Sequence, residues 1–187
     1  MKKFELTAES KINIFGKKLF RIKALISFGN VEEGETGGWI EKEENLEQSS
    51  GNAWVYGDAE VYGDAWVSGN ARVSGNARVY GNAWVSGNAW VSSNARVYGN
   101  AWVSGNARVY GDADYTTIHG FGTQFRTTTF FRCKDNQIRV SCGCFFGTIP
   151  EFREQVKNTR NGKIAEEYLM IADLMEKHFA EEKESGE

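Results

Sequence analysis

The chain has 187 residues, with 22 Lys and Arg against 25 Asp and Glu and a net charge of −3. Generic nucleic-acid binding is not expected, because it depends on clustered cations that displace counterions, and the sequence has no basic block. Acidic residues interrupt the N-terminus before a signal-peptide run forms, and no stretch reaches the roughly 18 apolar residues of a membrane helix. These features predict a cytoplasmic protein without a membrane partner.

Residues 1–50 are predicted to form a small N-terminal β cap. Apolar residues in short runs indicate three strands, over residues 3–7, 11–15 and 18–27. Gly16-Lys17 suits the turn of a hairpin. A cap is also expected on physical grounds, because a repeat array exposes unpaired strand edges at both ends.

Hexapeptide repeats occupy residues 51–116. Ten consecutive units from Gly51 to Tyr110 read Gly-Asn/Asp-Ala-x-Val-Tyr/Ser, with Ser93 as the single replacement of Gly, and an eleventh unit at residues 111–116 decays. Each x-Val-Tyr/Ser segment predicts a short strand whose Val points inward, since side chains alternate along a strand. Gly-Asn-Ala then forms a corner, because Gly and Asn tolerate positive φ. The predicted fold is mainly β, a parallel solenoid of stacked coils.

An 18-residue period sorts the outward positions better than a 12-residue period, which mixes tryptophan with arginine. The first column is uniform and contains Trp66, Trp84 and Trp102, each followed two places on by serine. The second places Glu60, Arg78 and Arg96 beside Tyr62, Tyr80 and Tyr98. The third alternates Trp54, Arg72, Trp90 and Arg108, where the spacing suits cation–π contacts. Three hexapeptides per coil predict a three-sided solenoid.

Two resemblances accompany this pattern. An aliphatic residue followed four places later by a small one resembles the signature of left-handed parallel β-helices. The segment before the repeats contains Phe28-Gly29-Asn30-Val31, Gly37-Gly38-Trp39-Ile40-Glu41 and Asn45-Leu46, and leads into Gly51-Asn52-Ala53-Trp54-Val55-Tyr56. Over residues 21–115 the chain therefore resembles the YdcK-like β-solenoid proteins of bacteria and phages. The first resemblance implies a left-handed solenoid. The second implies a solenoid without a known activity, although this chain is short, unusually regular and different at its C-terminal end.

Residues 117–187 are predicted to form an α+β domain, which resembles uncharacterised phage proteins. A β-hairpin is expected over residues 127–142 with a two-residue turn at Asp135-Asn136, which places Phe131 and Cys133 on the face of Ile138 and Val140. Thr148-Ile149-Pro150-Glu151 predicts the start of a helix, and Asn161-Gly162 separates it from a second, longer helix. The tail, residues 181–187, is acidic and predicted to be frayed.

Enzyme chemistry has weak support in the sequence. The left-handed β-helix is best known from hexapeptide acyltransferases, which use a histidine near a coil loop. The ten regular units of this chain contain no histidine, and only His119 and His178 occur elsewhere. Cys133, Cys142 and Cys144 lack the usual spacing of a zinc site and are predicted to be free thiols, two of them packed toward the helices. Corner Asp residues are explained by corner geometry rather than by calcium. No metal, cofactor or catalytic residue is predicted.

The outward side chains are the predicted binding residues, because their aromatic content exceeds what folding requires. They comprise Trp66, Trp84, Trp102, Tyr62, Tyr80, Tyr98, Arg78, Arg96, Trp54, Arg72, Trp90 and Arg108. Exposed apolar faces favour protein contacts, so the first hypothesis is a non-catalytic binding or assembly protein, a homo-oligomer with a trimer favoured, whose partner is a host or phage protein. The alternative is a nucleotide-binding decoy that sequesters a defence signal, because Trp, Tyr and Arg stack on bases. An acyltransferase is a third, less favoured alternative.

Overall fold

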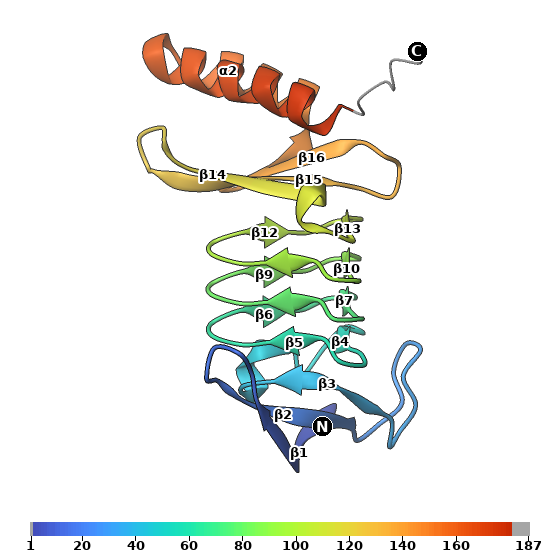
Figure 1. The fold of residues 1–187 in the computed structure, drawn as a ribbon. Helices are drawn as coiled ribbons and strands as arrows, with labels where there is room; N and C mark the ends of the chain where they lie inside the picture. Colours follow the sequence, from blue (N-terminus) through green and yellow to red (C-terminus); the bar gives the residue numbers. More distant parts are fainter. Residues whose placement is uncertain (1, 181–187) are drawn as a thin grey trace, which may run out of the picture.

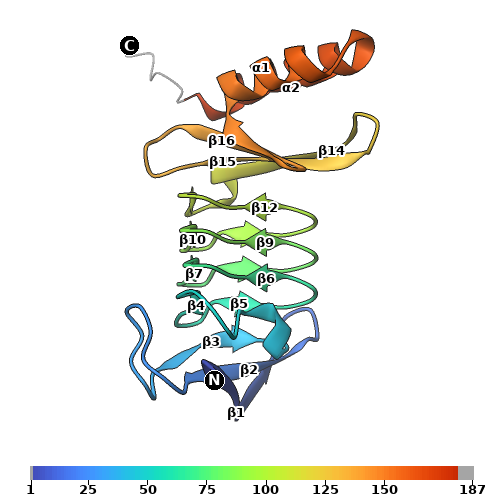
Figure 2. The same ribbon diagram turned by 180° about the vertical axis from the view of Figure 1, so that it is seen from behind.

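A computed structural model describes residues 2–180 of the chain. Figure 1 shows a column of coils with a β cap at one end and a four-stranded sheet with two helices at the other. The view from behind in Figure 2 shows the same order of layers. The predicted frayed tail, residues 181–187, lies outside the described residues. None of the helices in residues 2–180 has the length and apolar character needed to cross a membrane.

The coils consist of two-residue strands that pair in parallel at an interval of 18 residues. Trp66 pairs with Trp84 and Trp84 with Trp102, while Glu60 pairs with Arg78. The strands are β4 (Trp54–Val55), β5 (Glu60–Val61), β6 (Trp66–Val67), β7 (Arg72–Val73), β8 (Arg78–Val79), β9 (Trp84–Val85), β10 (Trp90–Val91), β11 (Arg96–Val97), β12 (Trp102–Val103) and β13 (Arg108–Val109). They form three separate ladders, so the predicted three-sided parallel solenoid is confirmed. The left-handed sense of the solenoid stays a prediction.

The interior of the coils is filled by the Val and Ala of every unit. Val67, Val85 and Val103 are fully buried one above another, and the alanines of the corners are buried beside them. The corner glycines have positive φ, and a Cβ on Gly87 would lie only 2.8 Å from the backbone nitrogen of Gly105 in the next coil. Ser93, the one substituted corner, adopts the same left-handed conformation at φ 57°. Small residues therefore allow coil to stack directly on coil.

Asparagine side chains form ladders along the corners. The amide nitrogen of Asn52 donates to the Oδ1 of Asn70 at 3.1 Å, and Asn70 donates to Asn88 at the same distance. A second corner repeats the bond between Asn82 and Asn100 at 3.0 Å. In-register stacking of identical amides is typical of parallel β stacks, because each amide satisfies the one below. The corner Asn of the repeat thus has a cohesive role in addition to its tolerance of tight turns.

The N-terminal cap contains β1 (Phe4–Ile12), β2 (Lys18–Ala24), β3 (Thr36–Ile40) and the 3-10 helix η1 (Glu43–Asn45). The predicted hairpin is present, but its first arm is one strand with a bulge between Leu6 and Ser10 rather than two strands. Residues of the cap already follow the coil path, because Trp39 pairs in parallel with Glu60 and Leu46 bridges to Val67.

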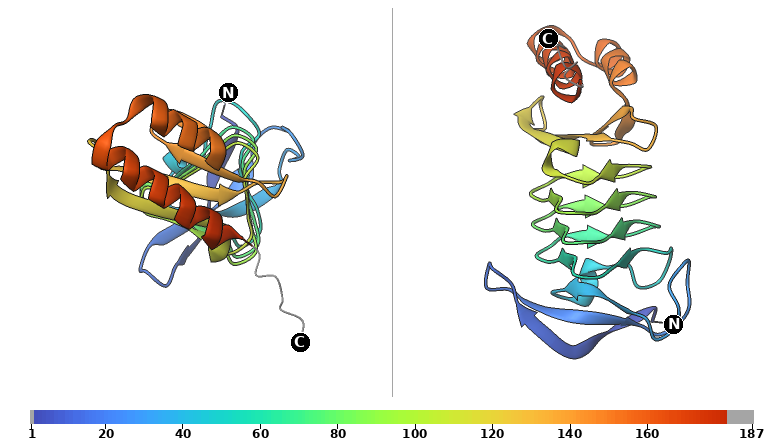
Figure 3. Two further views of the ribbon diagram at one scale, coloured as in Figure 1. Left: turned by 90° about the horizontal axis from the view of Figure 1, so that it is seen from above. Right: turned by 45° about the vertical axis from the view of Figure 1, so that its right-hand side comes forward.

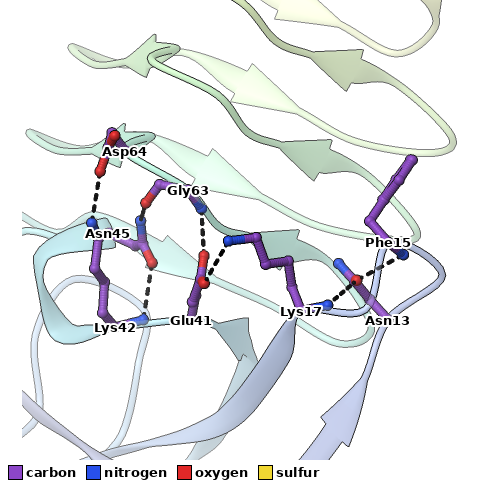
Figure 4. A network of polar contacts seen from close by, with 8 residues as sticks. All are labelled: Asn13, Phe15, Lys17, Glu41, Lys42, Asn45, Gly63 and Asp64. Atoms are coloured by element: carbon purple, nitrogen blue, oxygen red, sulfur yellow. Dashed lines mark hydrogen bonds and ion pairs between the residues drawn. The ribbon is translucent and has the colours of Figure 1, made fainter.

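Polar side chains fasten this cap to the first coils (Figure 4). Glu41 accepts a hydrogen bond from the Gly63 backbone N–H at 2.7 Å and one from the Lys17 ammonium at 3.1 Å. The Asn45 amide donates to the carbonyl of Gly63 at 3.0 Å and to that of Ala65 at 2.8 Å. No complete coil lies beneath the Gly63 and Ala65 carbonyls. The Asn45 side chain therefore supplies the hydrogen bonds that a strand of a preceding coil would otherwise donate.

The C-terminal part begins with the 3-10 helix η2 (Asp112–Asp114) and continues as an antiparallel sheet in the order of its strands. The elements are β14 (Tyr115–Phe121), β15 (Arg126–Arg132), β16 (Ile138–Cys142), β17 (Phe145–Thr148), α1 (Ile149–Thr159) and α2 (Gly162–Phe179). Figure 3 shows the helices on the face of this sheet that is turned away from the coils. The predicted capping box is present, with Thr148 accepting from Glu151 N–H, and Tyr168, Ile171 and Met175 of α2 are buried.

The predicted register of the β15–β16 hairpin is wrong by one residue. Phe130 pairs with Val140, so Phe130 and Val140 face the helices, whereas Phe131 and Cys133 pack on the coils. The loop has three residues instead of two, because Asn136 adopts a left-handed conformation at φ 59° and the Cys133 N–H bonds to the Gln137 carbonyl. A shift of one residue exchanges the two faces of a strand. Cys133 therefore does not share the helix-facing side with Cys142.

The C-terminal sheet also ends the backbone ladders of the coils. The Trp102 N–H donates to the Thr129 hydroxyl oxygen at 3.0 Å, and the Arg96 N–H donates to an Asp112 carboxylate oxygen at 2.9 Å. On the third side, the Lys134 N–H donates to the Asn106 carbonyl at 3.1 Å. All three sides of the last coil are thereby closed by groups that substitute for a further coil.

The interior assignment predicts that Val85→Asp prevents folding. The carboxylate would be buried without a partner between Val67 and Val103, which costs several kcal/mol. Circular dichroism and gel filtration measure the outcome, with Ser86→Asp as the control because the next side chain points outward. Soluble Val85→Asp protein with an unchanged melting temperature would contradict the assignment.

The end closure predicts that Thr129→Val destabilises the protein by about 1–3 kcal/mol, because the shape is kept while the Trp102 N–H loses its acceptor. Denaturant unfolding measures the change. Thr128→Val is the matched control: Thr128 is a buried neighbour whose hydroxyl donates to the weakly accepting Cys142 sulfur at 3.1 Å. Equal losses in the two variants would show that the Thr129 bond has no special role.

Candidate binding faces of the solenoid

The tryptophan face consists of the outward side chains of β6, β9 and β12. Trp66, Trp84 and Trp102 pack edge to face, with ring centroids 5.2 and 5.7 Å apart. Trp84 is 44% exposed and Trp102 is 37% exposed. The three serines that follow them complete the face, so its six outward side chains contain no charge. It is an uncharged aromatic surface with a few hydroxyl groups.

The tyrosine face is built on β5, β8 and β11. Tyr62, Tyr80 and Tyr98 stack almost in parallel, at centroid distances of 5.1 and 5.3 Å. Phe15 from the β1–β2 loop covers Tyr62 and Tyr80, at 6.2 and 6.1 Å. Burial raises the pKa of Tyr62 to about 12 and also raises the pKa of Tyr80, so both hydroxyls are neutral at physiological pH. Tyr98, at the other end of the stack, is exposed.

Two of the predicted binding residues on this face, Tyr62 and Arg78, already have partners within the protein. Tyr62 is only 4% exposed and cannot serve as a binding residue without movement of the cap. Glu60 is also buried and forms ion pairs with Lys11 at 2.8 Å and with the Arg78 Nε at 3.6 Å. Arg96 is exposed and makes no ion pair within the described residues. The open part of this face is therefore its C-terminal end.

The mixed face is built on β4, β7, β10 and β13, and its first tryptophan is not on the surface. Trp54 is fully buried, because Phe4 and Phe28 of the cap pack edge to face against it at 6.1 and 5.5 Å. The prediction that Trp54 belongs to an exposed ladder is wrong. Its outward direction is as predicted, but the cap covers it.

The remaining residues of the mixed face confirm one cation–π contact. The Arg108 guanidinium lies 5.7 Å from the Trp90 ring, and Trp90 also donates to the Ser74 hydroxyl at 3.1 Å. Arg108 is further held by the Ala107 carbonyl at 2.8 Å. Arg72 is exposed and stands between Trp54 and Trp90 in the ladder.

The structure adds an exposed apolar group that the repeat pattern does not indicate. Ile12, Ile14 and Phe15, at the tip of the β1–β2 hairpin, are 59–74% exposed. They lie beside the tyrosine face through the contacts of Phe15. Their apolar spacing was visible in the sequence, but it predicted a strand rather than a projecting loop.

The thiols and histidines form no shared centre in residues 2–180, where no group of three or more His, Cys, Asp and Glu has metal-binding geometry. Cys133 is buried against the coils, and burial raises its pKa to about 11. His119 is exposed on β14, where its Nδ1 lies 3.2 Å from the Thr127 hydroxyl. It therefore lies in the C-terminal sheet and outside the coils.

Comparison with known families identifies the repeats. The family model described as the YdcK Beta solenoid repeat matches residues 65–79, 71–87 and 77–93. Residues 65–93 are therefore similar to YdcK β-solenoid repeats. The matched YdcK repeats run from β6 to β10 and include Trp66, Trp84, Arg72, Arg78 and Trp90.

The predicted resemblance to YdcK-like solenoids is thereby confirmed for the repeats, whereas the resemblance of the C-terminal segment to phage proteins stays a prediction. No curated protein matches the chain. The YdcK repeat is a structural repeat, and a structural repeat protein is what the family match supports.

Proposed function

We propose that the protein is a non-catalytic assembly protein, a rigid rod that associates with other copies of itself through the tryptophan face. The observation that carries this proposal is the exposure of Trp84 and Trp102 on a face without charged side chains. Interface cores are depleted in charge and enriched in tryptophan, which buries a large area with little loss of side-chain entropy. Three copies with this face turned toward a threefold axis would cover the three tryptophans of the face in each copy.

The rod also separates two ends with different chemistry, which suits a scaffold. One end carries the apolar hairpin tip with Ile14 and Phe15, and the other carries the C-terminal sheet and helices (Figure 1). We propose that a host or phage protein in the cytoplasm binds at the C-terminal end, where Met170 and Leu174 of α2 are 70% and 57% exposed. An acyltransferase role is not part of the proposal, because the regular coils contain no histidine.

The self-association proposal predicts that Trp84→Ser converts a trimer into a monomer at micromolar concentration, because the substitution removes the central aromatic of the face. Light scattering coupled to gel filtration measures the mass. Trp90→Ser is the matched control, since Trp90 is 38% exposed but lies on the mixed face. A wild-type protein that is monomeric, or equal masses for the two variants, would refute the proposal.

A second candidate function is nucleotide binding at the open end of the tyrosine face, as in a decoy for a nucleotide signal. Tyr98 is 52% exposed and forms the wall of a cavity of about 270 Å³ with Asp112, Tyr115, Thr116 and Thr117. A base stacked on Tyr98 would continue the tyrosine stack, and base–aromatic stacking contributes about 1–3 kcal/mol. Arg96 supplies a cation nearby, although Asp112 opposes it.

This second candidate predicts that the double variant Arg78→Ala and Arg96→Ala loses nucleotide affinity while the rod stays folded and keeps its mass. Folding should survive because Lys11 still neutralises Glu60 at 2.8 Å. Isothermal titration with a panel of nucleotides measures affinity, and circular dichroism is the control for folding. Undiminished binding in the folded double variant would remove this face from consideration.

A further inference from the structure

A cavity of about 370 Å³ opens between the end of the C-terminal sheet and the two helices. Its lining combines side chains from β15, β16, β17, α1 and α2: Arg126, Cys142, Cys144, Phe145, Phe146, Phe152, Gln155, Val156, Thr159, Arg160 and Tyr168. The volume lies within the range of about 300–1,000 Å³ that is common for small-molecule sites. The cavity lies at the edge of the sheet, because its lining includes both Phe145, which packs on Phe152 of α1, and Phe146, which packs on Phe131 and lies near Gly105 of the last coil.

The distribution of charge in this cavity is uneven. Arg126 and Arg160 are both in its lining, which includes no Asp or Glu. The other arginines of the C-terminal part are paired: Arg132 with Asp114 at 3.6 Å, Arg139 with Asp135 at 2.8 Å, and Arg153 with Asp173 and Glu176 at 2.6 Å each. Within the described residues, the two arginines of this part without a carboxylate partner thus share one cavity. Two like charges in one cavity are unfavourable without an anion between them.

The position of Arg126 is built into the β16–β17 turn. Gly143 in that turn has φ +61°, and a Cβ at this residue would overlap the Arg126 guanidinium. A side chain at position 143 would require the exposed Arg126 side chain to shift. Both arginines also act on the hydroxyl of Tyr168: burial raises its pKa, while the charges of Arg160 and Arg126 oppose that rise. Arg126, Arg160 and Tyr168 all line this one cavity.

The remaining wall of the cavity is aromatic and uncharged, and its chemistry indicates what the part of the ligand beyond the anionic group would be. Phe145 and Tyr168 each pack against Phe152, at centroid distances of 5.5 and 5.8 Å. The Phe152 and Tyr168 rings are largely buried, and Phe145 is partly buried. A flat apolar group is the natural occupant of such a wall, because aromatic rings pair favourably with one another. The Gln155 amide adds a neutral hydrogen-bonding group at the edge.

We propose that this cavity binds a phosphate monoester that carries an aromatic ring, with the phosphate at Arg126 and Arg160 and the ring against the aromatic wall. A monoester carries about −1.5 to −2 charges at neutral pH, which matches two guanidinium groups. Guanidinium forks bind phosphate oxygens in pairs. Nucleoside monophosphates and simple aryl phosphates share this chemistry.

The test is isothermal titration of the full chain with phenyl phosphate, adenosine 5′-monophosphate and inorganic phosphate. At least one aromatic phosphate should bind, at least tenfold more tightly than inorganic phosphate, because only the aromatic compounds use the wall. The relative affinity of the two aromatic probes distinguishes an aryl phosphate from a nucleotide as the preferred class.

The double variant Arg126→Gln and Arg160→Gln should weaken this binding at least tenfold with an unchanged melting temperature, since both side chains are on the surface. The double variant Lys157→Gln and Lys177→Gln is the charge-matched control, because both lysines are exposed on α1 and α2 outside the cavity lining, and it should bind as the wild type does. Absence of aromatic phosphate binding at millimolar concentration, or undiminished binding by the Arg126 and Arg160 variant, overturns the proposal. An equal loss of binding in the lysine control would show that net charge rather than the arginine pair is responsible, and overturns the proposal equally.

Discussion

Parallel backbone pairing at an interval of 18 residues is the constraint on which the rest of the molecule depends. Each outward residue donates its N–H to the coil that follows, as when the Trp84 N–H bonds to the Ala101 carbonyl at 2.8 Å. The pairing brings identical side chains together, and this produces the valine interior, the asparagine ladders and the aromatic stacks at once. It also leaves unpaired groups at both ends, so the coils require caps.

The two caps solve the same problem with different chemistry. At the first coils, side chains such as Asn45 and Glu41 replace a strand, and the Lys3 ammonium donates to the Ala53 carbonyl at 3.2 Å. Lys3 is buried beneath the cap, and this burial lowers its pKa to about 8. At the last coil, Thr129 and Asp112 accept backbone N–H groups. Asp112 belongs to the decayed eleventh repeat unit, whereas Thr129 comes from β15 of the C-terminal sheet.

The sequence predicted the parts of the fold that repetition determines. Strand positions, inward residues and the three columns follow from local pattern, because every unit has the same neighbours. Features that depend on distant segments were not predictable. Trp54 occupies the same repeat position as the exposed Trp90, and its burial depends on Phe4 and Phe28 of the cap. The hairpin register depended on whether Asn136 could adopt positive φ, which decides between two- and three-residue loops. Arg126 and Arg160 are isolated in the sequence and converge only through the sheet and helices.

The three-sided cross-section gives the number of repeats a geometric meaning. Removal or duplication of one hexapeptide would move the chain on by one side, so the C-terminal sheet would rotate by a third of a turn relative to the β1–β2 hairpin. Removal or duplication of three hexapeptides would restore that orientation and change the length of the rod by one strand spacing, about 4.8 Å. The number of hexapeptide repeats therefore sets both the distance and the angle between the two ends, and gain or loss of three repeats at a time would change the distance without changing the orientation.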